Sequence, residues 1–198
     1  MMKTIEANIA GETIIKNSRF VTYLYRINEN SDVSLLIDLI KEQHKNANHY
    51  CYAYIINDVK KFSDDGEPGG TAGNPILQVL EKNDLNFVLA VVVRYFGGIK
   101  LGVGGLVRAY TKSVTNVLNH CSLVQLLDGY SLTIEFDYDY LKKVDYLLKD
   151  INVKRKIFNE KIRYEIDVDR NLYNIIKKDL NISLINEYEK LVEEMDKK

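Results

Sequence analysis

The chain has 198 residues, 46% of them hydrophobic and 28% charged, which is the composition of a globular protein with an ordinary hydrophobic core. Its 27 basic and 28 acidic residues give a net charge of −1, which excludes nucleic-acid binding driven by a general basic excess. The longest apolar run, residues 87–93, is far shorter than the ~20 residues of a membrane span, and two cysteines are too few for a disulfide framework, so we expect a cytoplasmic protein without a membrane segment.

The first part of the chain predicts short strands around one helix. Residues 3–27 alternate polar and apolar side chains around two turn signals, which indicates antiparallel strands. Ser31 is a suitable N-cap for a helix over residues 32–47, which carry an apolar stripe at helical spacing. Residues 48–57 are β-branched and aromatic at period two, so they predict another strand.

A polar, glycine-rich segment follows, DVKKFSDDGEPGGTAG at residues 58–73. We expect a loop without regular structure here. A loop of this length is uncommon inside a compact domain, and it is usually functional or disordered. Asn74 as N-cap and Pro75 at the first helical position predict a short helix over residues 75–83.

The next strand leads into the most unusual stretch of the sequence. Residues 86–96 are apolar on both faces until Arg94, which predicts a central strand covered on both sides. The stretch RYFGGIKLGVGGLVRAY begins at Arg94 and packs five glycines into nine residues. A helix is expected over residues 106–121, with an apolar face opposite Arg108 and Lys112.

Asp128-Gly129 is a turn signal, and we predict a domain boundary there, between residues 1–127 and 128–198. The pattern beyond it predicts strand (130–136), helix (139–149), strand (152–158), strand (161–168), helix (170–179) and strand (182–188). This βαββαβ order is the ferredoxin-like pattern, so the fold class is α+β. Residues 187–198 are expected to form a solvated strand end and a short charged helix.

The glycine-rich stretch predicts a strand-to-helix corner that faces an anion, because free N–H groups point outward at a helix N-terminus. The dinucleotide pattern fails at Val107 and the phosphate-loop pattern fails at Val103, so nucleotide binding is disfavoured. Close approach of a ligand to the backbone is expected at Gly97, Gly98, Gly102, Gly104 and Gly105.

Arg94 interrupts an apolar strand at its carboxyl end, where ligand sites open in α/β sheets. A buried arginine needs an anionic partner. Two alternatives stay open: an internal ion pair with Asp64, Asp65 or Glu67, or contact with a phosphate or RNA backbone. The anion-facing set that we predict is Arg94, Lys100, Arg108 and Lys112.

A second candidate site is SDDGEPGGTAG, residues 63–73. Its carboxylates could bind a metal or act as acid and base, or they could serve only loop solubility and turn formation. The EF-hand pattern is absent, and we expect no metal and no cofactor. Carboxylates and free N–H groups are expected from Asp64, Asp65, Glu67, Gly69, Gly70, Thr71 and Gly73.

His49 and Cys51 lie two apart on a predicted strand, hence on one face. With His44 they could bind zinc, but a structural zinc site needs four ligands and the sequence offers no fourth one nearby. His49 and Cys51 could also form a nucleophilic pair. A packed histidine and a buried thiol are favoured. In the second domain, the basic hairpin NVKRKIFNEKIRY (152–164) is compatible with RNA, although lysines that guard an edge strand are the commoner explanation.

At these residues a family resemblance emerges. The blocks RYFGGIKLGVGGLVRAY and SDDGEPGGTAGNPIL, together with SRF at 18–20 and the strand HYCYAY, closely resemble the bacterial, YigZ-like form of the IMPACT family. The resemblance covers roughly residues 15–120 and includes both glycine-rich blocks in order. The βαββαβ half is similar to the small C-terminal domain of bacterial members.

The resemblance implies a first domain folded like the fourth domain of elongation factor G and a second like that factor's ferredoxin-like C-terminal domain. Eukaryotic members belong to a regulator of translation that competes for a large activator of an initiation-factor kinase. The extra N-terminal domain that recruits this activator is not expected here, so neither is that partner.

We therefore expect a non-catalytic, translation-associated protein that binds RNA, the ribosome or a translation factor through the basic glycine stretch. The sequence leaves the oligomeric state open. The alternative is a hydrolase- or peptidase-like enzyme for a small molecule or phosphate ligand, which would work between the two glycine-rich loops with Asp64, Asp65 or Glu67 as acid, base or metal ligand.

Overall fold

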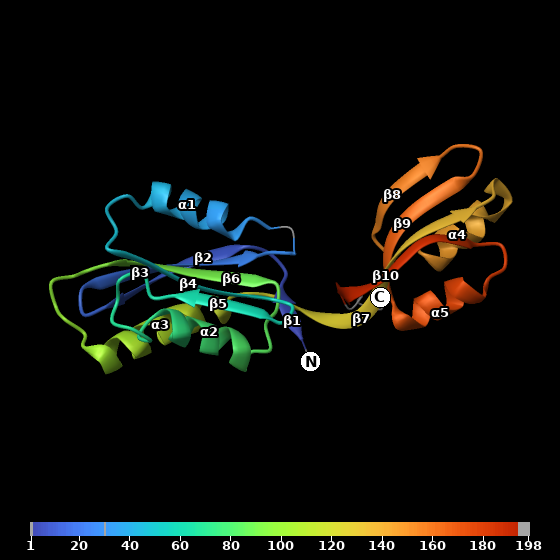
Figure 1. Cartoon of the computed structure of the whole chain (residues 1–198). Helices are drawn as coiled ribbons and strands as arrows, with labels where there is room; N and C mark the ends of the chain where they lie inside the picture. The colour runs from blue at the N-terminus through green and yellow to red at the C-terminus, as the bar shows by residue number, and fades with distance from the viewer. Residues whose placement is uncertain (1, 30, 194–198) are drawn as a thin grey trace. The chain divides into compact units, whose positions relative to one another are not determined.

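The computed structural model describes residues 2–29 and 31–193. The chain forms two compact units, Met1–Val124 and Gln125–Lys198, each a mixed α/β unit with its own sheet (Figure 1).

The first unit is built around an antiparallel sheet with the strand order β2-β3-β6-β4-β5. Its elements are β1 (Lys3–Ile5), β2 (Ile9–Ile15), β3 (Ser18–Arg26), α1 (Val33–Gln43), β4 (His49–Ile56), β5 (Val59–Ser63), α2 (Gly73–Lys82), β6 (Val88–Tyr95) and α3 (Val103–Leu118). Of the antiparallel strands expected in residues 3–27, β2 and β3 are confirmed as an antiparallel pair, whereas β1 lies outside this sheet.

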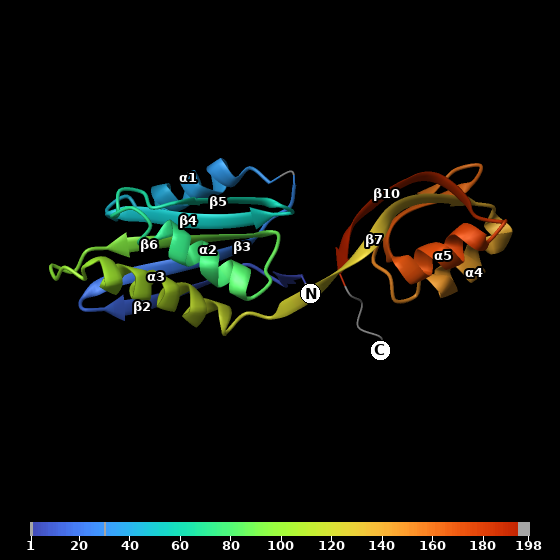
Figure 2. The same ribbon diagram turned by 60° about the horizontal axis from the view of Figure 1, so that its bottom comes forward.

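Helices cover both faces of this sheet, with α2 and α3 on one face and α1 on the other (Figures 1 and 2). Strand β6 lies in the middle, and Val88 to Val93 are fully buried. This confirms the central strand predicted from its two apolar faces. Arg94 follows at the carboxyl end of β6, so the glycine-rich stretch begins at an edge of the sheet.

Three local predictions are corrected. The expected structureless loop contains β5, an edge strand whose two exposed lysines hide the period-two pattern. The N-cap of α1 is Asp32, whose carboxylate accepts the Leu35 N–H, and not Ser31. Helix α2 begins at Gly73, one residue ahead of the predicted Asn74 cap.

The second unit has the element order that the pattern predicted. Its elements are β7 (Leu123–Phe136), a short 3-10 turn (Tyr138–Tyr140), α4 (Leu141–Leu147), β8 (Val153–Phe158), β9 (Ile162–Asp169), α5 (Arg170–Lys178) and β10 (Ser183–Glu193). The strands lie antiparallel in the order β10-β7-β9-β8. Both helices pack on one face of this sheet (Figure 2).

Strand β10 is longer than predicted, because it continues to Glu193 through residues that the sequence assigned to a charged helix. Its exposed residues include the apolar or aromatic Ile185 and Tyr188 and the charged Glu187 and Glu189. The rest of that predicted helix, residues 194–198, lies outside the described residues.

Candidate functional site

Two glycine-rich corners of the first unit have the same construction, since each joins the end of a strand to the start of a helix. The acidic corner, residues 64–73, joins β5 to α2, and the basic corner, residues 96–112, joins β6 to the first half of α3. Helix N-termini carry unsatisfied N–H groups and a partial positive charge, so both corners are suited to an anion.

In the acidic corner, the anion is supplied by the chain itself. The Asp64 carboxylate accepts the backbone N–H groups of Gly70 at 2.7 Å, Ala72 at 2.9 Å and Gly73 at 2.8 Å. Burial by itself raises the pKa of Asp64, but these three N–H groups lower it, and the net pKa lies below its ordinary value. The α2 N-terminus is therefore capped by a side chain from the preceding strand end.

The other predicted residues of the acidic corner also have partners within the chain. The Asp65 carboxylate accepts the Tyr50 N–H at 2.6 Å, and the Thr71 hydroxyl donates to the Pro68 carbonyl at 2.7 Å. Gly69 is exposed, with open space where a Cβ would stand. The N–H groups of Gly70 and Gly73, which we predicted to face a ligand, donate to the Asp64 carboxylate.

Arg94 and Glu67 form a buried ion pair between the two corners. Arg94 is 5% exposed and Glu67 is 8% exposed, and Arg94 Nη1 lies 2.5 Å from Glu67 Oε1. The Tyr110 hydroxyl donates to the same oxygen at 2.8 Å. Of the two alternatives for Arg94, the structure has the internal ion pair, with Glu67 as the partner. Arg94 is thus not a surface cation, although we predicted it in the anion-facing set.

The Arg94 guanidinium also lies between two aromatic rings. Its central carbon is 5.6 Å from the ring centroid of Phe20 and 5.6 Å from that of Phe96. Its Nε has no hydrogen-bond partner within the described residues. Arg94 is therefore fixed by one carboxylate and by two cation–π contacts.

The histidines and Cys51 have structural surroundings. The Cys51 thiol is buried 3.0 Å from the Asp64 carbonyl and 3.3 Å from the Tyr110 hydroxyl, and burial raises its pKa, which disfavours the nucleophilic thiolate. His49 Nδ1 donates to the Asp65 carbonyl at 2.8 Å. His44 lies between two tyrosine hydroxyls. No group of three metal-ligating side chains occurs within residues 2–29 and 31–193.

The basic corner lacks the internal anion of the acidic corner. The N-cap of α3 is Gly102, which has no side chain to accept an N–H, and the first turn contains no acidic residue. The sequence from 85 to 127 contains no Asp or Glu at all. Among the residues that the structure describes, Lys100, Arg108 and Lys112 have no ion-pair partner, and all three are exposed.

The glycines of the basic corner have different tasks. A Cβ at Gly97 would stand 2.0 Å from the carbonyl carbon of Asn17, so the β2–β3 turn packs directly on this backbone. Gly102 has φ 68° and ψ 167°, a conformation that is open essentially to glycine alone. The remaining glycines of the set are Gly98, Gly104 and Gly105.

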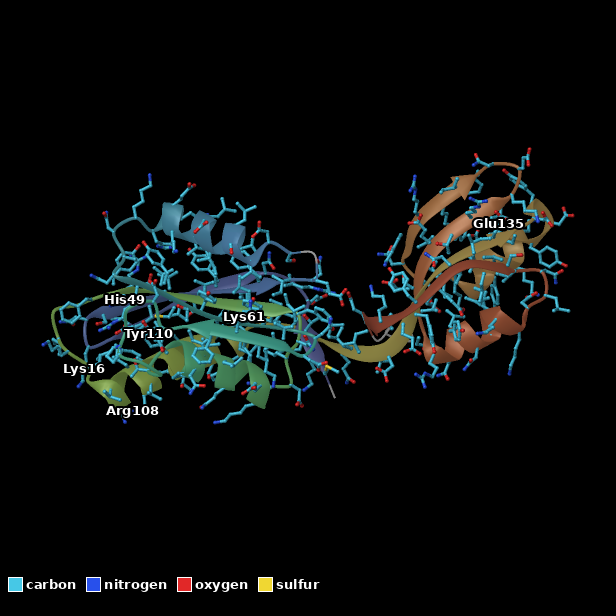
Figure 3. All side chains as sticks on the ribbon, viewed as in Figure 1. Lys16, His49, Lys61, Arg108, Tyr110 and Glu135 are labelled. Atoms are coloured by element: carbon cyan, nitrogen blue, oxygen red, sulfur yellow. The ribbon has the colours of Figure 1, made fainter. Side chains whose placement is uncertain are left out.

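Two features of the basic corner were not predicted from the sequence. Lys16, in the β2–β3 turn, lies at the same end of the first unit as Arg108 (Figure 3), and it has no ion-pair partner within the described residues. Phe96, Ile99 and Val103 are large apolar side chains that are exposed here. The contact of the β2–β3 turn with Gly97 joins segments almost eighty residues apart, so no local pattern could reveal it.

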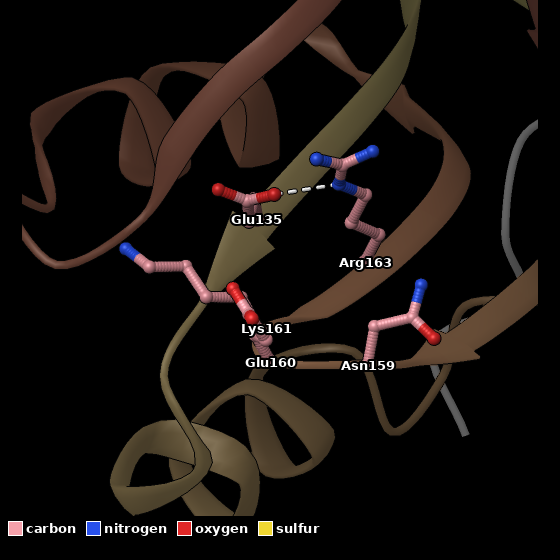
Figure 4. Close-up of a pocket in the computed structure, with 5 residues that line it drawn as sticks. All are labelled: Glu135, Asn159, Glu160, Lys161 and Arg163. Atoms are coloured by element: carbon pink, nitrogen blue, oxygen red, sulfur yellow. Dashed lines mark hydrogen bonds and ion pairs between the residues drawn. The ribbon is translucent and has the colours of Figure 1, made fainter.

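The basic hairpin of the second unit differs in that its charges are paired. Each of its five cations has a carboxylate within 4.0 Å, in the pairs Lys154–Asp167, Arg155–Glu165, Lys156–Asp145, Lys161–Asp137 and Arg163–Glu135. A shallow cavity of about 440 Å³ beside the turn is lined by both signs of charge, including the Glu135–Arg163 pair (Figure 4). The hairpin therefore presents no net excess of positive charge.

No helix in the described part of the chain is both long and apolar enough to cross a membrane.

Fold and site together define a class: a two-unit α/β protein whose first unit joins an acidic and a basic glycine corner through a buried ion pair. The Impact N-terminal domain family matches residues 16–118, which include both corners. The chain belongs to the IMPACT family.

Relatives of known sequence extend this similarity beyond the first unit. The IMPACT family member YvyE of Bacillus subtilis (strain 168) is 42% identical over 173 residues, 82% of this chain and 77% of that protein. The IMPACT family member YigZ of Escherichia coli (strain K12) is 37% identical over 139 residues, 68% of each. A crystal structure of a hypothetical protein is 28% identical with a TM-score of 0.62, and it covers 92% of this chain and 95% of that one.

Proposed function

We propose that this protein is a non-catalytic, translation-associated protein of the cytoplasm that binds RNA, the ribosome or a translation factor through its basic corner. The observation that carries the proposal is the set of unpaired cations, Lys100, Arg108 and Lys112, in a segment without any carboxylate. Lys16 adds a fourth cation at the same end of the unit. The link to translation rests on the resemblance of the chain to a family whose eukaryotic members belong to a translation regulator.

Electrostatics supports a local site over a general one. With a net charge of −1, the molecule as a whole does not attract a polyanion, so attraction must come from a region where cations are not neutralised. The hairpin of the second unit does not meet this condition, because carboxylates accompany its five cations. The basic corner does.

Arg94 has a supporting role in this proposal. Because it is buried and paired with Glu67, a phosphate could reach it only by separating the pair, at a cost of several kcal/mol. Direct contact is instead assigned to Lys100, Arg108 and Lys112. Gly98 and Gly102 have open space where a Cβ would stand, which leaves their backbone accessible to a ligand.

We also propose the finer fold assignments that the resemblance implies. The antiparallel order β10-β7-β9-β8 with both helices on one face supports a ferredoxin-like second unit. The likeness of the first unit to the fourth domain of elongation factor G rests on the family resemblance alone.

The alternative enzyme function gains no support from the acidic corner. The carboxylate of Asp64 accepts three N–H groups, that of Asp65 accepts one, and that of Glu67 holds Arg94 and Tyr110. Each of these carboxylates thus has a structural task within the first unit, and a substrate would have to displace a partner.

Co-sedimentation with purified ribosomes at several salt concentrations tests the proposal. Binding should fall with salt, and Lys100→Gln with Arg108→Gln should reduce the slope of log binding constant against log salt by about 2, because two phosphate contacts are lost. The matched control is Lys154→Gln with Arg155→Gln, which removes two paired cations and should leave binding unchanged. Equal binding by the corner variant and the wild type would overturn the proposal.

A further inference from the structure

We propose that Phe96 is a stacking platform for a base of single-stranded nucleic acid, beside the cations that contact its phosphates. This inference rests on the proposed function, with RNA as the ligand, and it specifies the form of RNA that the basic corner takes. It is carried by the exposure of Phe96, by the buried guanidinium on one side of its ring and by the fixed backbone around it.

The two sides of the Phe96 ring have different surroundings. Phe96 is 46% exposed, while the Arg94 guanidinium carbon lies 5.6 Å from the ring centroid. Arg94 is held away from the solvent, because its guanidinium is paired with Glu67 and its central carbon also lies 5.6 Å from the ring centroid of Phe20. The ring therefore rests on a buried cation and leaves a large part of its surface to a ligand.

The backbone beneath Phe96 is held from two other segments. The Asn48 side-chain oxygen accepts the Phe96 N–H at 2.8 Å, and the Ser18 hydroxyl accepts the Gly97 N–H at 3.2 Å. Gly97 lies directly on the backbone of Asn17, where no Cβ fits. A platform that is fixed before binding loses less conformational entropy when the ligand arrives.

Charge and ring together indicate the class of ligand. Sites for single-stranded nucleic acid combine cations that follow the backbone with aromatic rings on which bases stack. Lys100 and Arg108 supply unpaired charge within the same corner. In a duplex the base faces are already stacked on one another, so a duplex could use the cations but not the ring. An acidic peptide would likewise satisfy the cations without needing an aromatic ring.

Fluorescence anisotropy with a labelled uridine decamer and the full chain tests this inference. Phe96→Leu keeps an apolar side chain but removes the ring, and it should weaken binding by about 5- to 100-fold, which corresponds to one stacked base. Phe96→Trp should bind as well as the wild type or better. Phe62→Leu is the matched control, since Phe62 in β5 is 48% exposed, and it should have no effect.

Three further probes separate stacking from charge. On an abasic strand of the same length, Phe96→Leu should bind like the wild type, since the phosphates remain and the bases are gone. On a thymidine decamer the variant should lose as much as on uridine, because stacking does not involve the 2′-hydroxyl. On a double-stranded RNA decamer Phe96→Leu should change nothing. Thermal melting of each variant checks that the fold is retained.

The inference is overturned if Phe96→Leu binds the uridine decamer within twofold of the wild type, or if it loses as much on the abasic strand. Binding of polyglutamate in place of the decamer would also overturn it, in favour of an acidic protein partner. If the variant with Lys100→Gln and Arg108→Gln no longer binds ribosomes while Phe96→Leu binds the decamer normally, the stacking role of Phe96 is wrong and the proposed function stands. If the wild type binds neither ribosomes nor any RNA strand, both are wrong.

Discussion

The acidic and basic corners start from the same arrangement, a strand end, a glycine-rich turn and a helix N-terminus, and they end in opposite electrostatic states. In the acidic corner, Asp64 follows the strand directly and reaches the first N–H groups of α2. In the basic corner, the segment from 85 to 127 contains no carboxylate, and Gly102 caps α3 with no side chain. We therefore expect that the side chains within reach of such a corner, and not its glycines, decide whether it can receive an outside anion.

The buried ion pair joins the two corners and makes them depend on one another. Arg94 belongs to the strand that leads into the basic corner, whereas Glu67 belongs to the acidic corner. The pair neutralises Arg94 at the carboxyl end of β6. It also places the Arg94 guanidinium against the Phe96 ring, so we expect a substitution in one corner to alter the structure of the other.

The largest expected effect comes from breaking this pair. Arg94→Met removes the cation at similar length and leaves the Glu67 carboxylate buried with the Tyr110 hydroxyl as its donor and His49 Nε2 4.0 Å away. An uncompensated buried charge typically costs about 3 to 5 kcal/mol of the free energy of unfolding. Urea unfolding at neutral pH measures this loss.

The control for that experiment is an ion pair at the surface of the same unit. Lys60→Met removes the partner of Glu81 from a solvent-exposed ion pair in which Lys60 Nζ lies 2.8 Å from Glu81 Oε1. It should lower the free energy of unfolding by less than about 1 kcal/mol. If Arg94→Met costs no more than Lys60→Met, the pair does not hold the two corners together.

Most of the fold could be predicted from the sequence, because hydrophobic periodicity and turn residues are local signals. The apolar faces of β6 and the βαββαβ order appeared in this way. Strand β5 could not, since an edge strand with lysines at its centre carries a polar pattern. The N-cap of α2 was missed for a related reason: the capping carboxylate of Asp64 lies eight residues before Ala72, outside any local capping motif.

The two corners also differ in the backbone conformation of single glycines. Gly102→Ala places a side chain at φ 68° and ψ 167°, and it should cost about 1 to 3 kcal/mol of the free energy of unfolding. Gly69→Ala in the acidic corner is the control, because φ is not in the left-handed region there and open space surrounds the position. It should be neutral or stabilise by up to about 1 kcal/mol. Equal unfolding midpoints for the two variants would show that the basic corner does not need the Gly102 conformation.

The candidate site was less predictable than the fold, because its decisive contacts are long-range. The sequence indicated that Arg94 needs an anion but could not choose between Glu67 and a ligand, since that choice depends on how β6 and the acidic corner meet. It also gave Phe96 no special weight. The contacts of Asn48 and Ser18 reveal that the backbone at this ring is fixed, and the ring lies against the buried Arg94 guanidinium.

The smallest expected effect comes from Asp64→Ala. This change tests the difference between the two corners most directly, because it removes the internal anion of the acidic corner. Asp64→Ala removes the acceptor of three N–H groups and should cost about 0.5 to 2 kcal/mol at pH 7, as for other lost helix caps. The pKa of Asp64 is lowered in the folded state, so its contribution is complete above the unfolded pKa near 3.8 and disappears as the pH falls through the folded pKa. The difference between wild type and variant should therefore shrink below about pH 4.

Asp58→Asn is the control for this loss, since Asp58 is exposed beside the same strand, and its effect should stay within about 0.5 kcal/mol. Phosphate then tests the vacated corner. Millimolar phosphate should raise the melting temperature of Asp64→Ala more than that of the wild type, because an anion at a helix N-terminus replaces the lost carboxylate. Chloride at equal ionic strength should not discriminate between them. An equal phosphate response in both proteins would mean that the difference between the corners lies in their shape and not in the presence of an internal anion.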